Sequence, residues 1–165
     1  MSATFYGVGV GPGDPELITL KAARLIQQSP VLCYLVNAHG ESQAKHIARD
    51  VLADVKTAPI EIAIEMPMAI DRTAANAAYD SGAEQIKQQL DQGNDVVFLC
   101  EGDPLFFGSY AYLLERLADD YPCASVPGIS SVNAAANALG LPLTEQNESF
   151  VVMSGRHSSE ALEQA

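Results

Sequence analysis

Short apolar runs alternate with longer amphipathic segments along most of the chain. Apolar runs bounded by turn residues are typical of buried strands, and apolar positions spaced by three and four are typical of helices. Alternation of the two predicts an α/β fold, a three-layer domain with a five-stranded, mainly parallel sheet between helices. The strand candidates, in chain order, are Thr4–Val10, Val31–Val36, Ile60–Ile64, Val96–Cys100 and Cys123–Val126.

The segments between these runs carry helical patterns. The last of them is rich in alanine, which suits close packing, and it is followed by Gly140 and Pro142, residue types that end helices. The expected helices are Pro15–Gln28, Glu41–Ala53, Ala74–Gln92, Phe107–Asp119 and Ser130–Leu139.

The C-terminal stretch predicts the start of a second α/β domain. The polar residues Thr144–Glu148 resemble a linker, Phe150–Met153 is a sixth apolar run, and Arg156–Ala165 has the pattern of a polar helix. A strand with one or two helical turns cannot bury a core of its own. We therefore expect residues 1–145 to form the first domain, and residues 146–165 to be a linker and the first strand and helix of a domain left incomplete by truncation or proteolysis.

Composition narrows the class of protein. The 165 residues, 48% hydrophobic, suffice for one α/β domain. A formal charge of −12 without a basic stripe argues against nucleic acid as a partner, and none is expected. Nothing resembles a membrane span or signal peptide, so we expect a cytoplasmic protein without membrane contact. The histidines follow no ligand spacing, so no protein-held metal is expected. Cys33, Cys100 and Cys123 are expected to be reduced core thiols.

Three unusual loops follow strands, and the first, Gly7–Leu17, contains four glycines. It does not fit the dinucleotide pattern G-x-G-x-x-G, and no Gly-Lys-Ser/Thr follows as in a phosphate-binding loop. Asp14 also places a carboxylate where a helix N-terminus would receive phosphate. Asp14 is expected to be an N-cap with Pro15 at the first helical position, a role compatible with ligand contact.

The second loop is Glu101–Phe107, in which Gly102 allows a tight turn and Pro104 keeps Asp103 out of helical geometry. The Asp103 carboxylate can then project over the sheet edge, beside an apolar lip of Leu105, Phe106 and Phe107; the alternative is that Asp103 caps the next helix.

The third loop is Pro127–Ser131, where Ser130 or Ser131 is expected to be an N-cap. Loops that follow parallel strands lie at one edge of the sheet, which is where such folds bind ligands. Together the three loops predict a pocket for a planar ligand that is not strongly anionic.

These loops resemble those of the tetrapyrrole (corrin and porphyrin) methylases. The likeness is carried by Gly7–Ala22, Glu101–Pro104 and Val126–Ser131, and it covers residues 4 to about 155. Within the family the sequence is most similar to the precorrin-2 C(20)-methyltransferases, through Met66-Pro67-Met68 with Asp71-Arg72 and through Cys100–Ser109. Many relatives have a second glycine at the position of Glu101.

The resemblance implies a two-domain, homodimeric enzyme that holds S-adenosylmethionine between its domains and methylates C20 of precorrin-2 or cobalt-precorrin-2 in cobalamin biosynthesis. A chain without the second domain could fold without catalysing. The alternatives are another family enzyme, such as uroporphyrinogen-III C-methyltransferase or diphthine synthase, or a non-catalytic nucleotide- or cofactor-binding module. The resemblance also implies the cofactor contacts. Pro12 would touch the cofactor from the first loop, and Gly102, Asp103 and Leu105 would hold its ribose and methionine portion. Phe106 would form a wall of that pocket, and Ser130 and Ser131 would contact the methionine end.

Methyl transfer to an electron-rich carbon depends mainly on positioning, and a base is needed only to remove the proton left on the methylated carbon. Asp14 lies where the resemblance implies reach toward the tetrapyrrole, and it is the candidate base, although a carboxylate at a helix N-terminus is a weak one. Asp103 is assigned to binding. The candidate partners for substrate carboxylates are Lys21, Arg24, Lys45, Arg49, Arg72 and Arg156. Of these, Arg72 is the best placed, because it is expected in the loop after the third strand.

Overall fold

The computed structural model of the chain describes residues 2–67, 72–154, 158 and 160. The chain divides into two compact units, Met1–Ser131 and Val132–Ala165. The first contains the sheet and both helical layers, and each unit is described by itself below.

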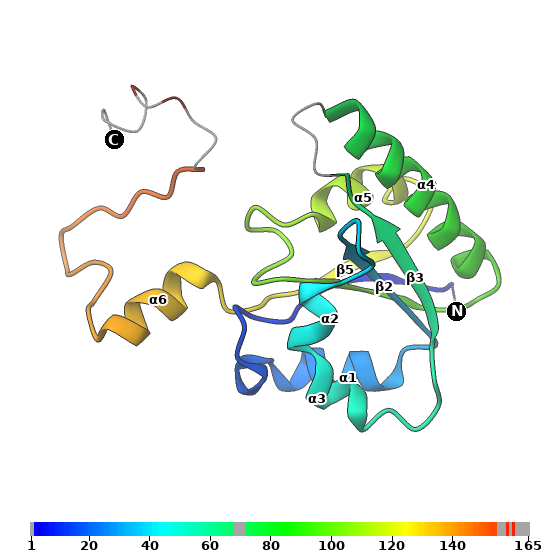
Figure 1. Ribbon diagram of the computed structural model, residues 1–165, viewed down its shortest axis with the longest axis horizontal. Coiled ribbons are helices and arrows are strands. Elements are labelled where there is room, and N and C mark those ends of the chain that lie inside the picture. Colours follow the sequence, from blue (N-terminus) through cyan, green and yellow to red (C-terminus); the bar gives the residue numbers. More distant parts are fainter. Residues whose placement is uncertain (1, 68–71, 155–157, 159, 161–165) are drawn as a thin grey trace. The chain divides into compact units, whose positions relative to one another are not determined.

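The first unit is built on a five-stranded sheet whose neighbouring strands are all parallel, as predicted (Figure 1). The order β3-β2-β4-β1-β5 puts β2, β4 and β1 inside the sheet, and every residue of β4 is buried. Buried parallel strands read as continuous apolar runs, which is why the sequence located them within a residue or two. The strands are β1 Phe5–Gly9, β2 Val31–Val36, β3 Ile60–Glu65, β4 Val96–Cys100 and β5 Cys123–Val126.

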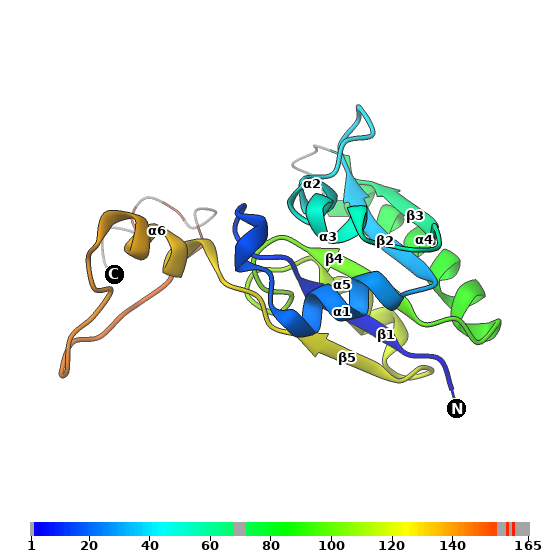
Figure 2. The same cartoon turned by 90° about the horizontal axis from the view of Figure 1, so that it is seen from below.

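Helices cover both faces of the sheet, which gives the expected three layers. In Figures 1 and 2, α1, α2 and α3 lie on one face and α4 and α5 on the other. Alternate strand residues enter two separate cores: Val97 and Leu99 pack with the first group of helices, and Val96, Phe98 and Cys100 with the second. The helices are α1 Leu20–Gln28, α2 Gln43–Ile47, α3 Arg49–Ala53, α4 Arg72–Asp91 and α5 Tyr110–Leu117.

Two helices predicted as continuous are broken. Pro15–Leu17 forms a separate 3-10 turn, η1, and Thr19 then caps α1 by accepting a hydrogen bond from the Ala22 N–H at 3.2 Å. Threonine is a strong N-cap, so α1 restarts there although the apolar pattern runs on. A second break, at Ala48, separates α2 from α3.

The second unit contains α6, Ser131–Leu139, which begins on the last residue of the first unit. Gly140, with φ of 65°, ends α6, and the N–H of Leu141 bonds to the carbonyl of Ala136, as in a glycine-terminated helix. The predicted strand Phe150–Met153 has no regular secondary structure, since a strand forms only beside a partner. The incomplete second domain stays a prediction.

Candidate functional site

The three predicted loops meet through backbone contacts between glycines. A Cβ built on Gly128 would lie 2.0 Å from the carbonyl oxygen of Gly102 and 2.9 Å from the Cα of Gly9. A Cβ on Gly9 would lie 2.6 Å from the Gly102 oxygen and from the Gly128 nitrogen. Only glycine allows this approach. The loops after β1, β4 and β5 therefore come together at the carboxyl edge of the sheet.

Backbone hydrogen bonds hold the first two loops to each other. The N–H of Gly102 donates to the carbonyl of Gly11 at 2.8 Å, and the Gly11 N–H donates to the carbonyl of Gly102 at 3.3 Å. The φ angles of Gly11 and Gly102 are 81° and 61°, in the left-handed region that favours glycine. The two turns thus form one rigid backbone platform.

Asp103 links the second loop to the third. Its Oδ1 accepts a hydrogen bond from the Leu105 N–H at 2.9 Å, and its Oδ2 accepts one from the Gly128 N–H at 3.0 Å. Asp103 does not cap α5, which begins only at Tyr110, because Phe107 has a φ of 55° that no helix allows. Each carboxylate oxygen still has acceptor capacity for a ligand.

A pocket of about 210 Å³ opens beside this junction. It brings together six of the predicted cofactor residues, including Asp103 and Ser130 from different loops. Its lining residues are Pro12, Gln43, Ile47, Glu101, Gly102, Asp103, Phe106, Ser130 and Ser131.

Leu105 and Asp14, the other two predicted site residues, do not line this pocket. Leu105 is 58% exposed and contributes its backbone N–H to the turn. The Asp14 carboxylate accepts a hydrogen bond from the Glu16 N–H at 2.9 Å, which confirms it as the N-cap of η1. The predicted helix is interrupted at Ile18, so Asp14 caps only the short turn η1. The catalytic role of Asp14 stays a prediction.

A larger hollow of about 610 Å³ adjoins the pocket and shares Gln43 and Glu101 with it. Its lining residues are Leu35, Val36, Asn37, Glu41, Ser42, Gln43, His46, Met66 and Glu101.

Three lining residues of the smaller pocket, Gln43, Ile47 and Glu101, were not among the predicted ones. Gln43 and Ile47 belong to α2, which follows β2, and the loop after β2 ends at the same sheet edge as the three loops considered. The rule that ligands lie at the carboxyl ends of strands, applied to β2 as well, would have found them.

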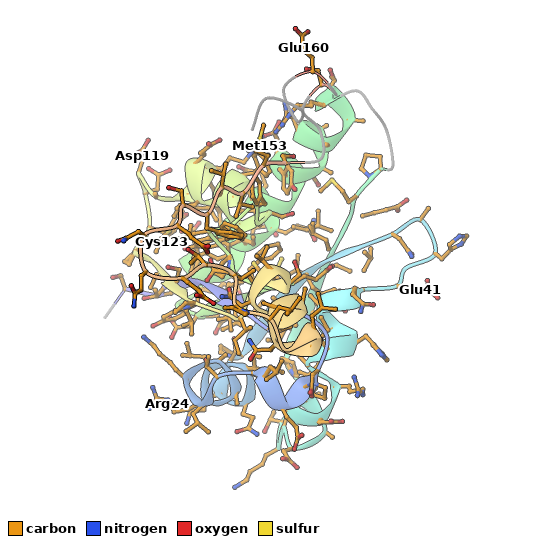
Figure 3. All side chains as sticks on the ribbon, turned by 90° about the vertical axis from the view of Figure 1, so that its left-hand side faces the viewer. Arg24, Glu41, Asp119, Cys123, Met153 and Glu160 are labelled. Carbon is orange, nitrogen blue, oxygen red and sulfur yellow. The ribbon has the colours of Figure 1, made fainter. Side chains whose placement is uncertain are left out.

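Those predicted basic partners for substrate carboxylates that the structure describes lie away from both hollows. Lys45 forms an ion pair with Glu61 and donates a hydrogen bond to Tyr34. Arg72 was expected in the loop after β3, but it is the first residue of α4. Its guanidinium lies 4.9 Å from the centre of the Tyr112 ring. Arg24 is exposed and projects from α1 (Figure 3). Met68, Asp71 and Arg156 lie outside the described residues. Of the described basic candidates, none lines either hollow.

The cysteines are free, as expected. Cys33 and Cys100 are buried, and burial raises the pKa of both thiols well above the ordinary range; Cys123 is half-buried. Across the residues that the structure describes, no group of three or more His, Cys, Asp or Glu side chains could hold a metal ion. Within the same residues, every helix is too short or too polar to cross a membrane.

Known proteins are similar to this chain in both sequence and fold. The precorrin-2 C(20)-methyltransferase of a Sinorhizobium species is 34% identical over 157 residues, which are 90% of this chain and 63% of that protein. The cobalamin biosynthesis protein CobIJ of Mycobacterium tuberculosis is 38% identical over 160 residues, 92% of this chain and 31% of that protein. The chain thus spans between about one third and two thirds of these curated relatives.

A solved uroporphyrin-III C-methyl transferase from Thermus thermophilus, complexed with S-adenyl homocysteine, superposes with a TM-score of 0.58 at 29% identity, over 88% of this chain and 51% of that one. Residues 4–165 match the family described as Tetrapyrrole (Corrin/Porphyrin) Methylases. With its sheet and its three motif-bearing loops arranged as above, the chain belongs to the tetrapyrrole methylase family.

Proposed function

We propose that the chain is part of an S-adenosylmethionine-dependent methyltransferase that methylates C20 of precorrin-2 or cobalt-precorrin-2 in cobalamin biosynthesis. The observation that carries this proposal is the convergence of Pro12, Asp103 and Ser130 on one pocket. The name and 34% identity of the Sinorhizobium relative support the choice of substrate.

The chemistry of the pocket fits the cofactor. S-adenosylmethionine carries an ammonium group and ribose hydroxyls, and the Asp103 carboxylate can accept hydrogen bonds from either, worth about 1.5–3 kcal/mol for a charged pair. The ring of Phe106 supplies an apolar wall. No basic side chain among the described residues lines the pocket, which disfavours a phosphate-bearing nucleotide.

The cofactor, when bound, would supply a methyl group activated by a positively charged sulfur. The residues of this chain would bind and orient the donor, and Phe106 would help exclude water beside it. A pocket of about 210 Å³ is small for a whole ligand of this size, for which pockets of roughly 300–1,000 Å³ are typical. The remainder of the binding site would come from the proposed second domain.

We assign the acceptor to the adjoining hollow, in which no described lysine or arginine faces the substrate carboxylates. Leu35, Val36 and Met66 give it an apolar part that a flat macrocycle could cover, and at about 610 Å³ it is the larger of the two. A donor in the smaller pocket and an acceptor in the larger hollow would meet at the residues that both share. We further propose a homodimeric, cytoplasmic enzyme.

A second candidate substrate is uroporphyrinogen III. The structural likeness to the Thermus thermophilus enzyme, at 29% identity, favours it. Both candidates require the same cofactor, so the substrate assay separates them.

Calorimetric titration of the full-length protein with S-adenosylhomocysteine tests the cofactor assignment, with ATP and NADH as phosphate-bearing comparisons. We expect binding of S-adenosylhomocysteine, loss of that binding in Asp103→Ala, and no binding of ATP or NADH. Methylation of precorrin-2 but not of uroporphyrinogen III, assayed with the full-length protein, would then identify the substrate. Binding of ATP without binding of S-adenosylhomocysteine would overturn the proposal in favour of a nucleotide-binding module.

A further inference from the structure

Glu101 occupies the boundary between the two hollows. It is the first residue after β4 and lines both the pocket of about 210 Å³ and the hollow of about 610 Å³. Among the described residues, only Gln43 also lines both. An amide cannot act as a base near neutral pH, whereas an ionised carboxylate can accept a proton.

Three other carboxylates near this edge, those of Asp14, Asp103 and Glu41, already accept hydrogen bonds. Asp14 accepts a hydrogen bond from its own turn, and Asp103 accepts two from backbone N–H groups. Glu41, in the larger hollow, accepts a hydrogen bond from the side-chain amide of Asn37 at 3.0 Å. The Glu101 carboxylate makes no hydrogen bond or ion pair with any described residue, and the residue is exposed. Both of its oxygens are therefore available to a bound molecule.

We propose that Glu101 is the catalytic residue that removes the proton from the methylated carbon of the substrate. The inference rests on the proposed function, which places the methyl donor in the smaller pocket and the acceptor carbon in the larger hollow. The transferred methyl group then passes beside Glu101. Asp14 lines neither hollow and His46 lines only the larger, so both are worse placed for this step.

The step balances in atoms and electrons. An electron pair of the macrocycle forms the new carbon–carbon bond while the sulfur–methyl bond breaks, and its pair stays on sulfur, which gives S-adenosylhomocysteine. The acceptor carbon now carries both the methyl group and its original hydrogen. A Glu101 oxygen takes that hydrogen as a proton, and the electron pair of the broken C–H bond returns to the macrocycle.

The test uses the full-length protein with Glu101→Gln, Glu101→Asp and His46→Gln, the last as the competing base. Turnover of precorrin-2 and of precorrin-2 deuterated at the acceptor carbon is measured, together with S-adenosylhomocysteine affinity and thermal unfolding. Because Glu101 is exposed and makes no hydrogen bond or ion pair with any described residue, Glu101→Gln should unfold at the same temperature as the parent protein.

We expect Glu101→Gln to lower kcat by about 10²–10⁴-fold, the usual contribution of a general base, and to reveal a deuterium isotope effect as proton removal becomes rate-limiting. Glu101→Asp should regain part of the rate. Three results would each overturn the assignment of Glu101. The first is a Glu101→Gln variant that turns over as fast as the parent protein, and the second is slow turnover of that variant without an isotope effect. The third is an isotope effect that appears in His46→Gln and not in Glu101→Gln. A parent protein that fails to bind S-adenosylhomocysteine or to methylate precorrin-2 would overturn the proposed function as well, so the two failures are distinguishable.

Discussion

The carboxylate of Asp103 accepts a hydrogen bond at 3.0 Å from the backbone N–H of Gly128, a residue 25 positions further along the chain. The same carboxylate accepts a hydrogen bond from the Leu105 N–H within its own loop. One side chain therefore fixes the spacing of two loops and also faces the pocket between them. Its structural role and its proposed binding role share the same two oxygens.

The first prediction concerns Asp103→Asn. Asparagine has one acceptor oxygen in place of two, so one backbone N–H loses its partner and the charge is lost. We expect the free energy of unfolding in urea to fall by about 1–3 kcal/mol and S-adenosylhomocysteine affinity to fall about tenfold or more. Asp119→Asn is the matched control, because Asp119 is exposed after α5 (Figure 3) and neither value should change. Unchanged stability in Asp103→Asn would contradict the linking role.

The second prediction concerns Gly128→Ala. Its methyl group would need to lie 2.0 Å from the Gly102 carbonyl oxygen, so the loops must move apart. We expect a loss of about 2–4 kcal/mol in unfolding free energy, together with loss of S-adenosylhomocysteine binding. Urea unfolding and calorimetry measure the two effects.

Gly93→Ala provides the comparison for Gly128→Ala. Gly93 has φ of 84°, and a Cβ there would meet nothing within 4 Å. Alanine at that position costs only the left-handed backbone conformation, about 1–2 kcal/mol. An equal cost for the two substitutions, with binding retained in both, would show that the glycine contact is not required.

The third prediction concerns the backbone of Phe107, whose φ is 55° and whose side chain is 69% exposed. Asparagine tolerates this conformation and β-branched valine does not, while both substitutions remove the ring. We expect Phe107→Asn to be more stable than Phe107→Val by about 1 kcal/mol or more, measured by urea unfolding. The same pair of substitutions at Phe106, which lacks a positive φ, should not show this order.

The fourth prediction concerns Glu61, which accepts hydrogen bonds from Lys45 and Tyr34. The hydrogen bond from Lys45, followed by that from Tyr34, lowers the pKa of Glu61 below its ordinary value of 4.5. A carboxylate with a lowered folded-state pKa stabilises the fold above the unfolded-state pKa, and this contribution is lost as the pH falls through the folded-state value.

Glu61→Gln should therefore lower the unfolding free energy at pH 7 by less than about 1 kcal/mol, since the pair is partly exposed. The difference from the parent protein should shrink as the pH falls below about 4.5. Urea unfolding across pH 3–7 measures it. Glu65→Gln, on the same strand and exposed, should change stability little at any pH. A difference that grows toward low pH would contradict the assignment.

The sheet could be predicted from sequence because each buried strand is a short apolar run bounded by turn residues. β4 is the clearest example, since all five of its residues are buried. Helix breaks were harder to predict: the break before Thr19 depends on a side-chain cap, and an apolar pattern that continues across it carries no sign of the interruption. Local hydrogen bonding decided the outcome there.

The site was predictable wherever a loop has unusual residues. The loops that contain Pro12, Asp103 and Ser130 stood out as glycine-, proline- or serine-rich turns after strands, and the family resemblance then implied these residues as cofactor contacts. The structure brings the three residues to one pocket. Gln43 and Ile47 were missed because they belong to an ordinary amphipathic helix. Their place in the pocket follows from the position of β2 in the sheet, which one-dimensional periodicity does not encode.

The contact among Gly9, Gly102 and Gly128 also shows which positions of the site can be varied in an engineering experiment. A mutagenesis library aimed at new acceptors should leave Gly9 and Gly128 unchanged, because a Cβ at either position would lie within 3 Å of the backbone of a neighbouring loop. Randomising Gln43 and Phe106 would instead vary the walls of the pocket while the backbone junction beneath them keeps its shape.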